Sequence, residues 1–197
     1  QLVALSREAA GGRAFVAGDL TTTGVPLEPA GTMTYHELFE IYTEQITALA
    51  KAGADLLVVE TMLGIDEMTV ALEAAQSVCA LPVLCSMTVQ ADGSGYFGGT
   101  CVEAVETLQE LGAAAVGINC STGPDQLESL VRNMRQAARV PLLVKPNAGM
   151  PEISPEGEAI YSMGPEAFAQ HMRTLIDAGA ALVGGCCGTN PRYISAL

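Results

Sequence analysis

Three cysteines are the residues of this 197-residue chain best suited to chemistry. Cys186 and Cys187 are adjacent, have glycines on both sides within 184–188, and directly follow an apolar run. Glycine lets the backbone bend sharply, and a bend at a strand end can turn both sulfur atoms inward. Cys120 follows a second apolar run, 114–116. Three thiolates at strand ends suit a catalytic zinc ion that has three protein ligands and one open position, although free cysteines also pack as small core residues.

The other three cysteines have a different pattern. Cys79, Cys85 and Cys101 lie on apolar faces of predicted helices or strands, so we interpret them as packing residues rather than ligands. Because the six cysteines fall within helix and strand patterns, they do not resemble a disulfide scaffold. This usage favours a reducing, cytoplasmic setting.

The composition predicts a folded domain and excludes two classes of partner. Hydrophobic residues make up 49% of the chain and charged residues 16%, which allows a sizeable core. The net charge is −13 and the nine Lys and Arg residues are scattered singly, so nucleic acid is a poor partner. No apolar run approaches the roughly 18–20 residues that a membrane span requires, and the first residues do not resemble a signal peptide.

Helical and strand-like segments alternate along the chain. The predicted strands are 14–17, 56–59, 83–87, 114–119, 142–145 and 181–185. The predicted helices are 1–10, 34–51, 65–79, 101–111, 124–138, 165–178 and 191–197. The strands are apolar at consecutive positions, which is typical of a parallel sheet covered on both faces. Glycine or proline marks the entry to successive strands at intervals of about 30 residues, the length of one βα unit, and residues 149–164 form an insertion.

Two architectures fit about six βα units, an open doubly wound sheet and a barrel. No Gly-x-Gly-x-x-Gly segment follows the first predicted strand, which disfavours a nucleotide-binding open sheet. The chemically informative residues gather at the carboxyl ends of several strands, where a barrel places its site: Asp19, Glu60, Ser86, Cys120, Asn147, Cys186 and Cys187. We therefore predict an α/β fold, a (β/α)8 TIM barrel, with residues 1–197 as a single domain that carries about six of the eight units.

The segments 117–120 and 184–189 together resemble the zinc-binding signature of the homocysteine S-methyltransferase family. The resemblance continues through 59–62, 85–88 and 145–149, in family order, and covers nearly the whole chain. It is strongest to the N-terminal homocysteine-binding module of the cobalamin-dependent methionine synthase branch. The Asp-Gly-rich first strand and the second unit of the family are absent here, so the chain is expected to correspond to the third to eighth units.

The resemblance implies a zinc-dependent methyl transfer to the thiol of homocysteine, giving methionine. It assigns Cys120, Cys186 and Cys187 as zinc ligands and catalytic residues, and Glu60, Asn147, Ala148 and Gly149 as substrate-binding residues. Glu60 would pair with the substrate ammonium, and Asn147 with the two following amides would hold the amino and carboxylate groups. The expected methyl donor is methylcobalamin on another domain or subunit, because the chain contains no corrinoid-binding Asp-x-His-x-x-Gly segment.

Several alternatives remain open from the sequence. The methyl donor could instead be betaine or S-methylmethionine. Lys145 at a strand end could form a Schiff base, or Gly184-Gly185 could cradle a phosphate, in a different barrel enzyme. The cysteines could form a non-catalytic zinc module. Glu60 could be a solvated loop carboxylate and Asn147 a turn residue, and we interpret Asp19 as a loop cap.

Overall fold

The computed structural model describes residues 1–197 and contains one six-stranded parallel sheet. The sheet order is β1-β2-β3-β4-β5-β8. Its strands are β1 (Ala17–Thr21), β2 (Leu56–Met62), β3 (Val83–Met87), β4 (Ala115–Cys120), β5 (Leu142–Pro146) and β8 (Ala180–Val183). Strands that are consecutive in this order lie side by side and run in the same direction, so all their carboxyl ends meet at one edge of the sheet.

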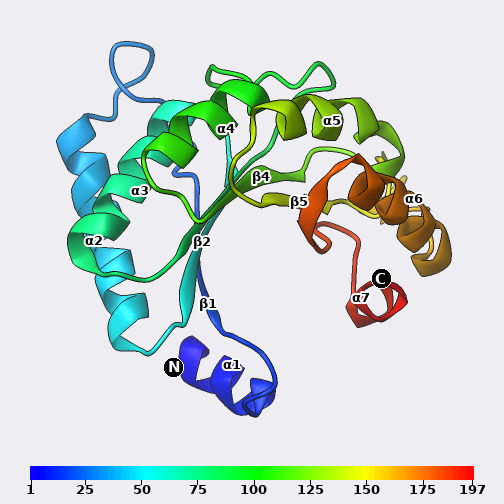
Figure 1. Cartoon of the computed structure of the whole chain (residues 1–197), viewed down its shortest axis with the longest axis horizontal. Coiled ribbons are helices and arrows are strands. Elements are labelled where there is room, and N and C mark those ends of the chain that lie inside the picture. The colour runs from blue at the N-terminus through cyan, green and yellow to red at the C-terminus, as the bar shows by residue number, and fades with distance from the viewer.

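Most helices cover the outer, convex face of the curved sheet, whereas the first helix lies below the sheet and the last packs against the helix before it (Figure 1). The helices of the chain are α1 (Leu2–Ala10), α2 (Tyr35–Lys51), α3 (Ile65–Val78), α4 (Cys101–Glu110), α5 (Glu128–Ala137), α6 (Pro165–Ala178) and α7 (Pro191–Ala196). A short 3-10 helix, η1 (Pro124–Gln126), precedes α5. The inner, concave face carries no helix layer, and the edge strands β1 and β8 do not pair with each other. The arrangement is that of a barrel wall that is not closed.

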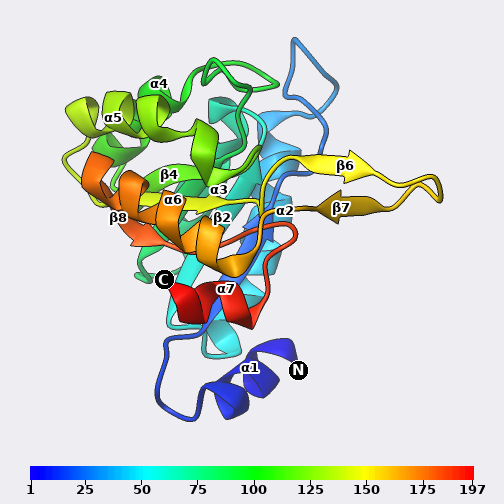
Figure 2. The same ribbon diagram turned by 90° about the vertical axis from the view of Figure 1, so that its right-hand side faces the viewer.

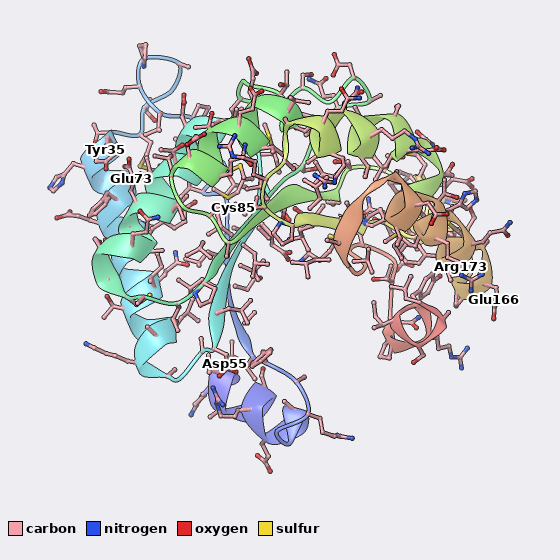
Figure 3. All side chains as sticks on the ribbon, viewed as in Figure 1. Tyr35, Asp55, Glu73, Cys85, Glu166 and Arg173 are labelled. Carbon is pink, nitrogen blue, oxygen red and sulfur yellow. The ribbon has the colours of Figure 1, made fainter.

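The core lies between the sheet and the outer helices. A cluster of 38 buried residues joins outward-facing strand side chains to the inner faces of the helices. Cys85 and Cys101 belong to this cluster, and Cys85 is labelled among the strands in Figure 3. Burial raises the pKa of the Cys85 thiol to about 12, so packing rather than ligation is its role, as predicted.

The strands and helices follow the predicted alternation, with three differences. The first strand is Ala17–Thr21 rather than 14–17, because pairing of Ala17 with Leu56 sets where the ladder begins, and Phe15 is left 85% exposed. The helix predicted at 124–138 is divided into η1 and α5. The insertion 149–164 contains an unpredicted antiparallel hairpin, β6 (Pro151–Ile153) and β7 (Ala159–Tyr161).

The hairpin projects from the carboxyl-terminal edge of the sheet (Figure 2). It leaves the sheet after β5 and returns to α6, so its base lies beside the loop that follows β8. No helix in the structure combines the length and the apolar character that crossing a membrane demands.

Candidate metal centre

The sulfur atoms of three cysteines converge at the carboxyl ends of β4 and β8. Cys120 is the last residue of β4, and Cys186 and Cys187 follow β8. The three Sγ atoms lie within 4.8 Å of one another, with Cys120 to Cys187 at 3.6 Å and Cys186 to Cys187 at 4.0 Å. Three thiolates at about 2.3 Å from one tetrahedral zinc would lie roughly 3.8 Å apart. The structure therefore brings the three predicted ligands together, and two of their sulfur–sulfur distances lie close to this value.

Backbone hydrogen bonds fix the loop that carries the paired cysteines to the end of β5. The Cys186 amide donates to the Pro146 carbonyl at 2.8 Å, and the Ala148 amide donates to the Cys187 carbonyl at 2.9 Å. The Asn147 side-chain oxygen accepts from the Cys187 amide at 3.1 Å. This pairing continues the β5–β8 ladder past the end of β8 and sets the direction in which both sulfur atoms point.

Left-handed backbone conformations concentrate beside the cysteines. Thr61, Cys120 and Ser121 have φ angles of 59°, 60° and 64°, and they are the only residues other than glycine with positive φ. Such a conformation costs about 1–2 kcal/mol per residue. Hydrogen bonds offset this cost, since the Ser121 hydroxyl accepts from the Val89 amide at 2.8 Å and pairs with the Thr88 hydroxyl at 3.0 Å. Strain held in place this way is typical of functional sites.

Asn119 links three strand ends beneath the cysteines. Its side chain is buried, and its Oδ1 accepts from the Thr61 amide and from the Ser86 hydroxyl, each at 2.8 Å. Its Nδ2 donates to the Thr61 hydroxyl at 2.8 Å and lies 3.8 Å from the Cys186 sulfur. Sequence reasoning gave Asn119 no role of its own; its only signal was its position directly before Cys120.

The pKa values of Cys120 and Cys186 are shifted in opposite directions. The hydrogen bond between their sulfur atoms raises the pKa of Cys120, and burial adds to the rise. The same hydrogen bond, together with that from Asn119, lowers the pKa of Cys186 to about 5 even though burial opposes the change. In the metal-free protein Cys186 is therefore more easily deprotonated than Cys120.

A charged pair lies on the concave face next to the cysteines. The Lys145 ammonium pairs with the Glu60 carboxylate, and both side chains are largely buried. Asp19 is part of β1 and not the predicted loop cap, because the β1–β2 ladder extends past it. Desolvation, and then the Glu60 carboxylate, raise the pKa of Asp19, whereas Lys145 opposes the rise.

The segment after β5 supplies further polar groups. Asn147 is 3% exposed, and its Oδ1 is occupied by the Cys187 amide. The Ala148 amide is likewise occupied by the Cys187 carbonyl, whereas the Gly149 amide makes no hydrogen bond within the chain. Of the predicted substrate-binding donors, the Asn147 amide nitrogen and the Gly149 amide thus remain free.

The base of the β6–β7 hairpin packs against the paired cysteines. A β-carbon at Gly188 would lie 2.3 Å from the Tyr161 ring, so glycine is required for this approach. Desolvation, followed by the neighbouring Cys187, raises the pKa of Tyr161. The sequence analysis did not find Tyr161, because the hairpin that positions it was not predicted.

Comparison with known proteins places this geometry in a family. The sequence profile described as homocysteine S-methyltransferase matches residues 1–197. The chain belongs to the homocysteine S-methyltransferase family. The methionine synthases of Mycobacterium leprae and Mycobacterium tuberculosis are each 32% identical to it over 177 residues, which cover 87% of this chain. The chain spans 15% of the length of either relative.

Solved structures of similar fold confirm the predicted barrel class. The homocysteine methyltransferase MmuM from Escherichia coli in its apo form has a TM-score of 0.80 at 24% identity, over 99% of this chain and 70% of that chain. Its metallated form has a TM-score of 0.79 at 23% identity, over 99% of this chain and 67% of that one. The carboxyl transferase domain of Rhizobium etli pyruvate carboxylase has a TM-score of 0.58 at 17% identity, over 94% of this chain and 29% of that chain. The chain is therefore an open part of a TIM-type barrel.

The donor set of the family chain fits zinc. Three sulfur ligands with a partly exposed approach leave room for a fourth ligand, as catalytic zinc sites require. No histidine lies in this cluster, since His36 is exposed on α2 and His171 lies on α6.

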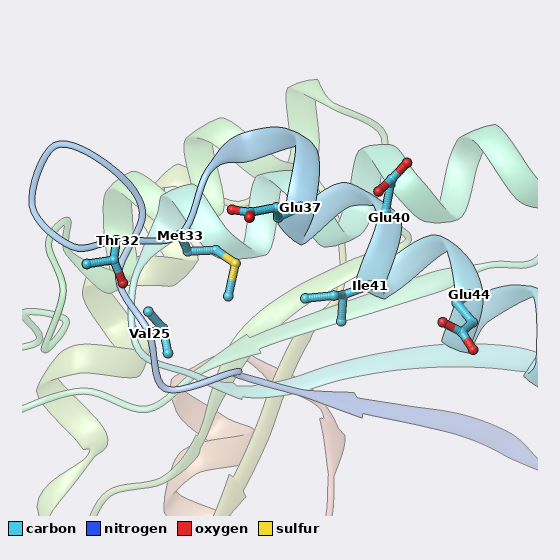
Figure 4. Close-up of a pocket in the computed structure, with 7 residues that line it drawn as sticks. All are labelled: Val25, Thr32, Met33, Glu37, Glu40, Ile41 and Glu44. Carbon is cyan, nitrogen blue, oxygen red and sulfur yellow. The ribbon is translucent and has the colours of Figure 1, made fainter.

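A groove elsewhere on the molecule carries none of this chemistry. It lies between α2 and the loop before it (Figure 4). Its lining residues are Val25, Thr32, Met33, Glu37, Glu40, Ile41 and Glu44. The groove holds carboxylates of one helix and no cysteine, which is typical of a solvated acidic helix face.

Proposed function

We propose that the chain binds zinc through Cys120, Cys186 and Cys187 and transfers a methyl group to the thiol of homocysteine, giving methionine. The observation that carries the proposal is the convergence of three sulfur atoms within 4.8 Å at the carboxyl edge of the barrel wall. Membership in the homocysteine S-methyltransferase family supports the thiol acceptor.

The chain's own residues prepare this site in three ways. When bound, zinc would hold a fourth thiol as its thiolate, which is the nucleophilic form. The three cysteines supply a net negative ligand set, and Asn119 donates toward Cys186. The left-handed conformation of Cys120 points its sulfur toward the other two.

The concave face beside the sulfur atoms would bind the amino acid end of the substrate. The Glu60 carboxylate would accept the substrate ammonium, and the Asn147 amide with the backbone at Ala148 and Gly149 would position its polar groups. Because the Ala148 amide is engaged by Cys187, the Gly149 amide is the stronger backbone donor of the two.

The proposed methyl donor is methylcobalamin carried by another domain or subunit. Similarity to two methionine synthases, of which the chain spans only a small part, supports a separate donor-carrying part. Betaine and S-methylmethionine are the alternative donors. Both are included in the experiment below, because the fold is also similar to that of a homocysteine methyltransferase.

The proposal predicts zinc-dependent formation of methionine. The zinc-loaded protein is incubated with homocysteine and, in separate reactions, methylcobalamin, S-methylmethionine or betaine, and methionine is measured by mass spectrometry. Removing one zinc ligand, by Cys120→Ser or Cys186→Ser, lowers the rate by at least about 100-fold, because the homocysteine thiol loses its activation.

The matched control is Cys79→Ser, which alters a half-buried cysteine outside the cluster. It should leave both zinc content and rate unchanged. Methionine formation at equal rates in wild type and Cys186→Ser, or in wild type after complete zinc removal, would contradict the proposal.

A further inference from the structure

Lys145 occupies a position unlike that of any other cation in the chain. It is the only one of nine Lys and Arg residues that lies in a strand. It pairs with Glu60 of β2, although β3 and β4 separate β2 from β5 in the sheet. Side chains of such distant strands meet only across the concave side of a curved sheet. The pair therefore spans the inner face, where a barrel binds its substrate.

The surroundings hold the Lys145 side chain between Glu60 and the cysteine loop. A β-carbon at Gly184 would lie 3.3 Å from its Cγ and 3.4 Å from its Cδ, so the glycine makes room for its stem. In the register of β4 and β5, Lys145 is paired with Asn119, whose amide reaches Cys186. The ammonium is thus the one positive side chain on the inner face next to the proposed thiol position.

We infer that Lys145 is a specificity-determining residue that binds the α-carboxylate of the amino acid thiol, after the substrate ammonium replaces it on Glu60. This inference rests on the proposed function, whose substrate is an amino acid thiol. Binding then exchanges one internal ion pair for two pairs with the substrate, Glu60 with the ammonium and Lys145 with the carboxylate.

The balance of charges on the inner face favours this exchange. A zwitterion adds one positive and one negative charge, so both side chains keep a partner. A thiol with only an ammonium group would take the Glu60 carboxylate from Lys145 and offer none in return, and a charge that loses its partner in a partly buried position is costly. The Ala148 amide is already engaged by the Cys187 carbonyl, which increases the need for another carboxylate partner.

The test compares two thiols in calorimetric titrations of the zinc-loaded protein. Homocysteine carries both charged groups, and 3-mercaptopropylamine carries the same thiol and ammonium without the carboxylate. Lys145→Met should weaken homocysteine binding about 10- to 100-fold, the range for one charged hydrogen bond. It should leave 3-mercaptopropylamine binding no weaker, and zinc content unchanged. Lys145→Arg should restore most of the preference, and Lys145→Gln provides a second neutral variant.

The outcomes separate this inference from the proposed function. Equal weakening of both thiols in Lys145→Met would show that Lys145 only holds Glu60, and unchanged homocysteine affinity would show that it has no role; either result overturns the inference alone. A zinc-loaded wild type that binds neither thiol would contradict the proposed function, and the inference with it.

Discussion

At the scale of single residues, the site depends on the opposite pKa shifts of two of its cysteines, Cys120 and Cys186. The Cys186 sulfur lies 3.8 Å from the Asn119 amide and 4.0 Å from the Cys187 sulfur, and Asn119 is in turn fixed by Thr61 and Ser86. The lowered pKa of Cys186 favours its thiolate form before any metal binds. Zinc binds thiolates, so this arrangement reduces the number of protons that metal binding must release.

The lowered pKa of Cys186 predicts selective alkylation of the metal-free protein by iodoacetamide. Between about pH 5 and the ordinary thiol pKa near 8.5, Cys186 is a thiolate while ordinary thiols are protonated. Its reaction should persist at pH 6 and decline only as the pH falls through about 5. Fragment-ion mass spectrometry distinguishes it from the adjacent Cys187.

Cys85 is the internal control in the same experiment. Burial raises its pKa to about 12 and hides its sulfur, so it should stay unmodified in the folded protein. A titration midpoint at pH 8 or higher for Cys186 would refute the lowered pKa of its thiol.

At the scale of elements, a buried carboxylate on α3 holds the chain as it leaves β1. Glu67 is 5% exposed and accepts from the Thr22 hydroxyl at 2.6 Å and from the Thr23 amide at 2.7 Å. It also accepts from the Tyr42 hydroxyl of α2 at 2.9 Å. One side chain thus joins α2, α3 and the end of β1, and helps to fix the strand that carries Asp19.

Glu67→Ala should lower the free energy of unfolding by about 3 kcal/mol, because the buried Tyr42 hydroxyl and the partly buried donors of Thr22 and Thr23 lose a charged acceptor. Glu73→Ala is the matched control on the same helix. Glu73 also accepts from a tyrosine of α2, Tyr35, at 2.6 Å, but this pair is exposed on the surface (Figure 3). Its loss should cost about 0.5 kcal/mol or less. Urea titrations that gave equal losses for the two variants would contradict the role of Glu67.

The sequence predicted those features that follow from local pattern. Consecutive apolar residues indicated a parallel sheet, whose carboxyl ends necessarily share one edge, so Cys120 could be placed beside Cys186 and Cys187. The β6–β7 hairpin could not be predicted, because three-residue strands have too short an alternation to recognise. Pairing of Lys145 with Glu60 depends on sheet curvature between strands that are not neighbours, which no local pattern encodes.

At the scale of the whole molecule, the proposed ligands come from distant parts of the chain. Cys120 and Cys187 are 67 residues apart in sequence, and β5, the hairpin and α6 lie between them. A metal ion that binds both would join β4 to the loop after β8 across β5. Zinc should therefore raise the midpoint of thermal unfolding, in proportion to its affinity for the folded state, and should not do so in Cys186→Ser.

The central claim, an open three-sulfur zinc site, is tested most directly by zinc-edge X-ray absorption. The protein is purified without chelator, its zinc is quantified, and spectra are recorded with and without homocysteine. We expect one zinc per chain with three sulfur ligands at about 2.3 Å, increasing to four when homocysteine is added. A chain that refuses zinc, or a zinc whose sulfur count does not change with homocysteine, would contradict the account.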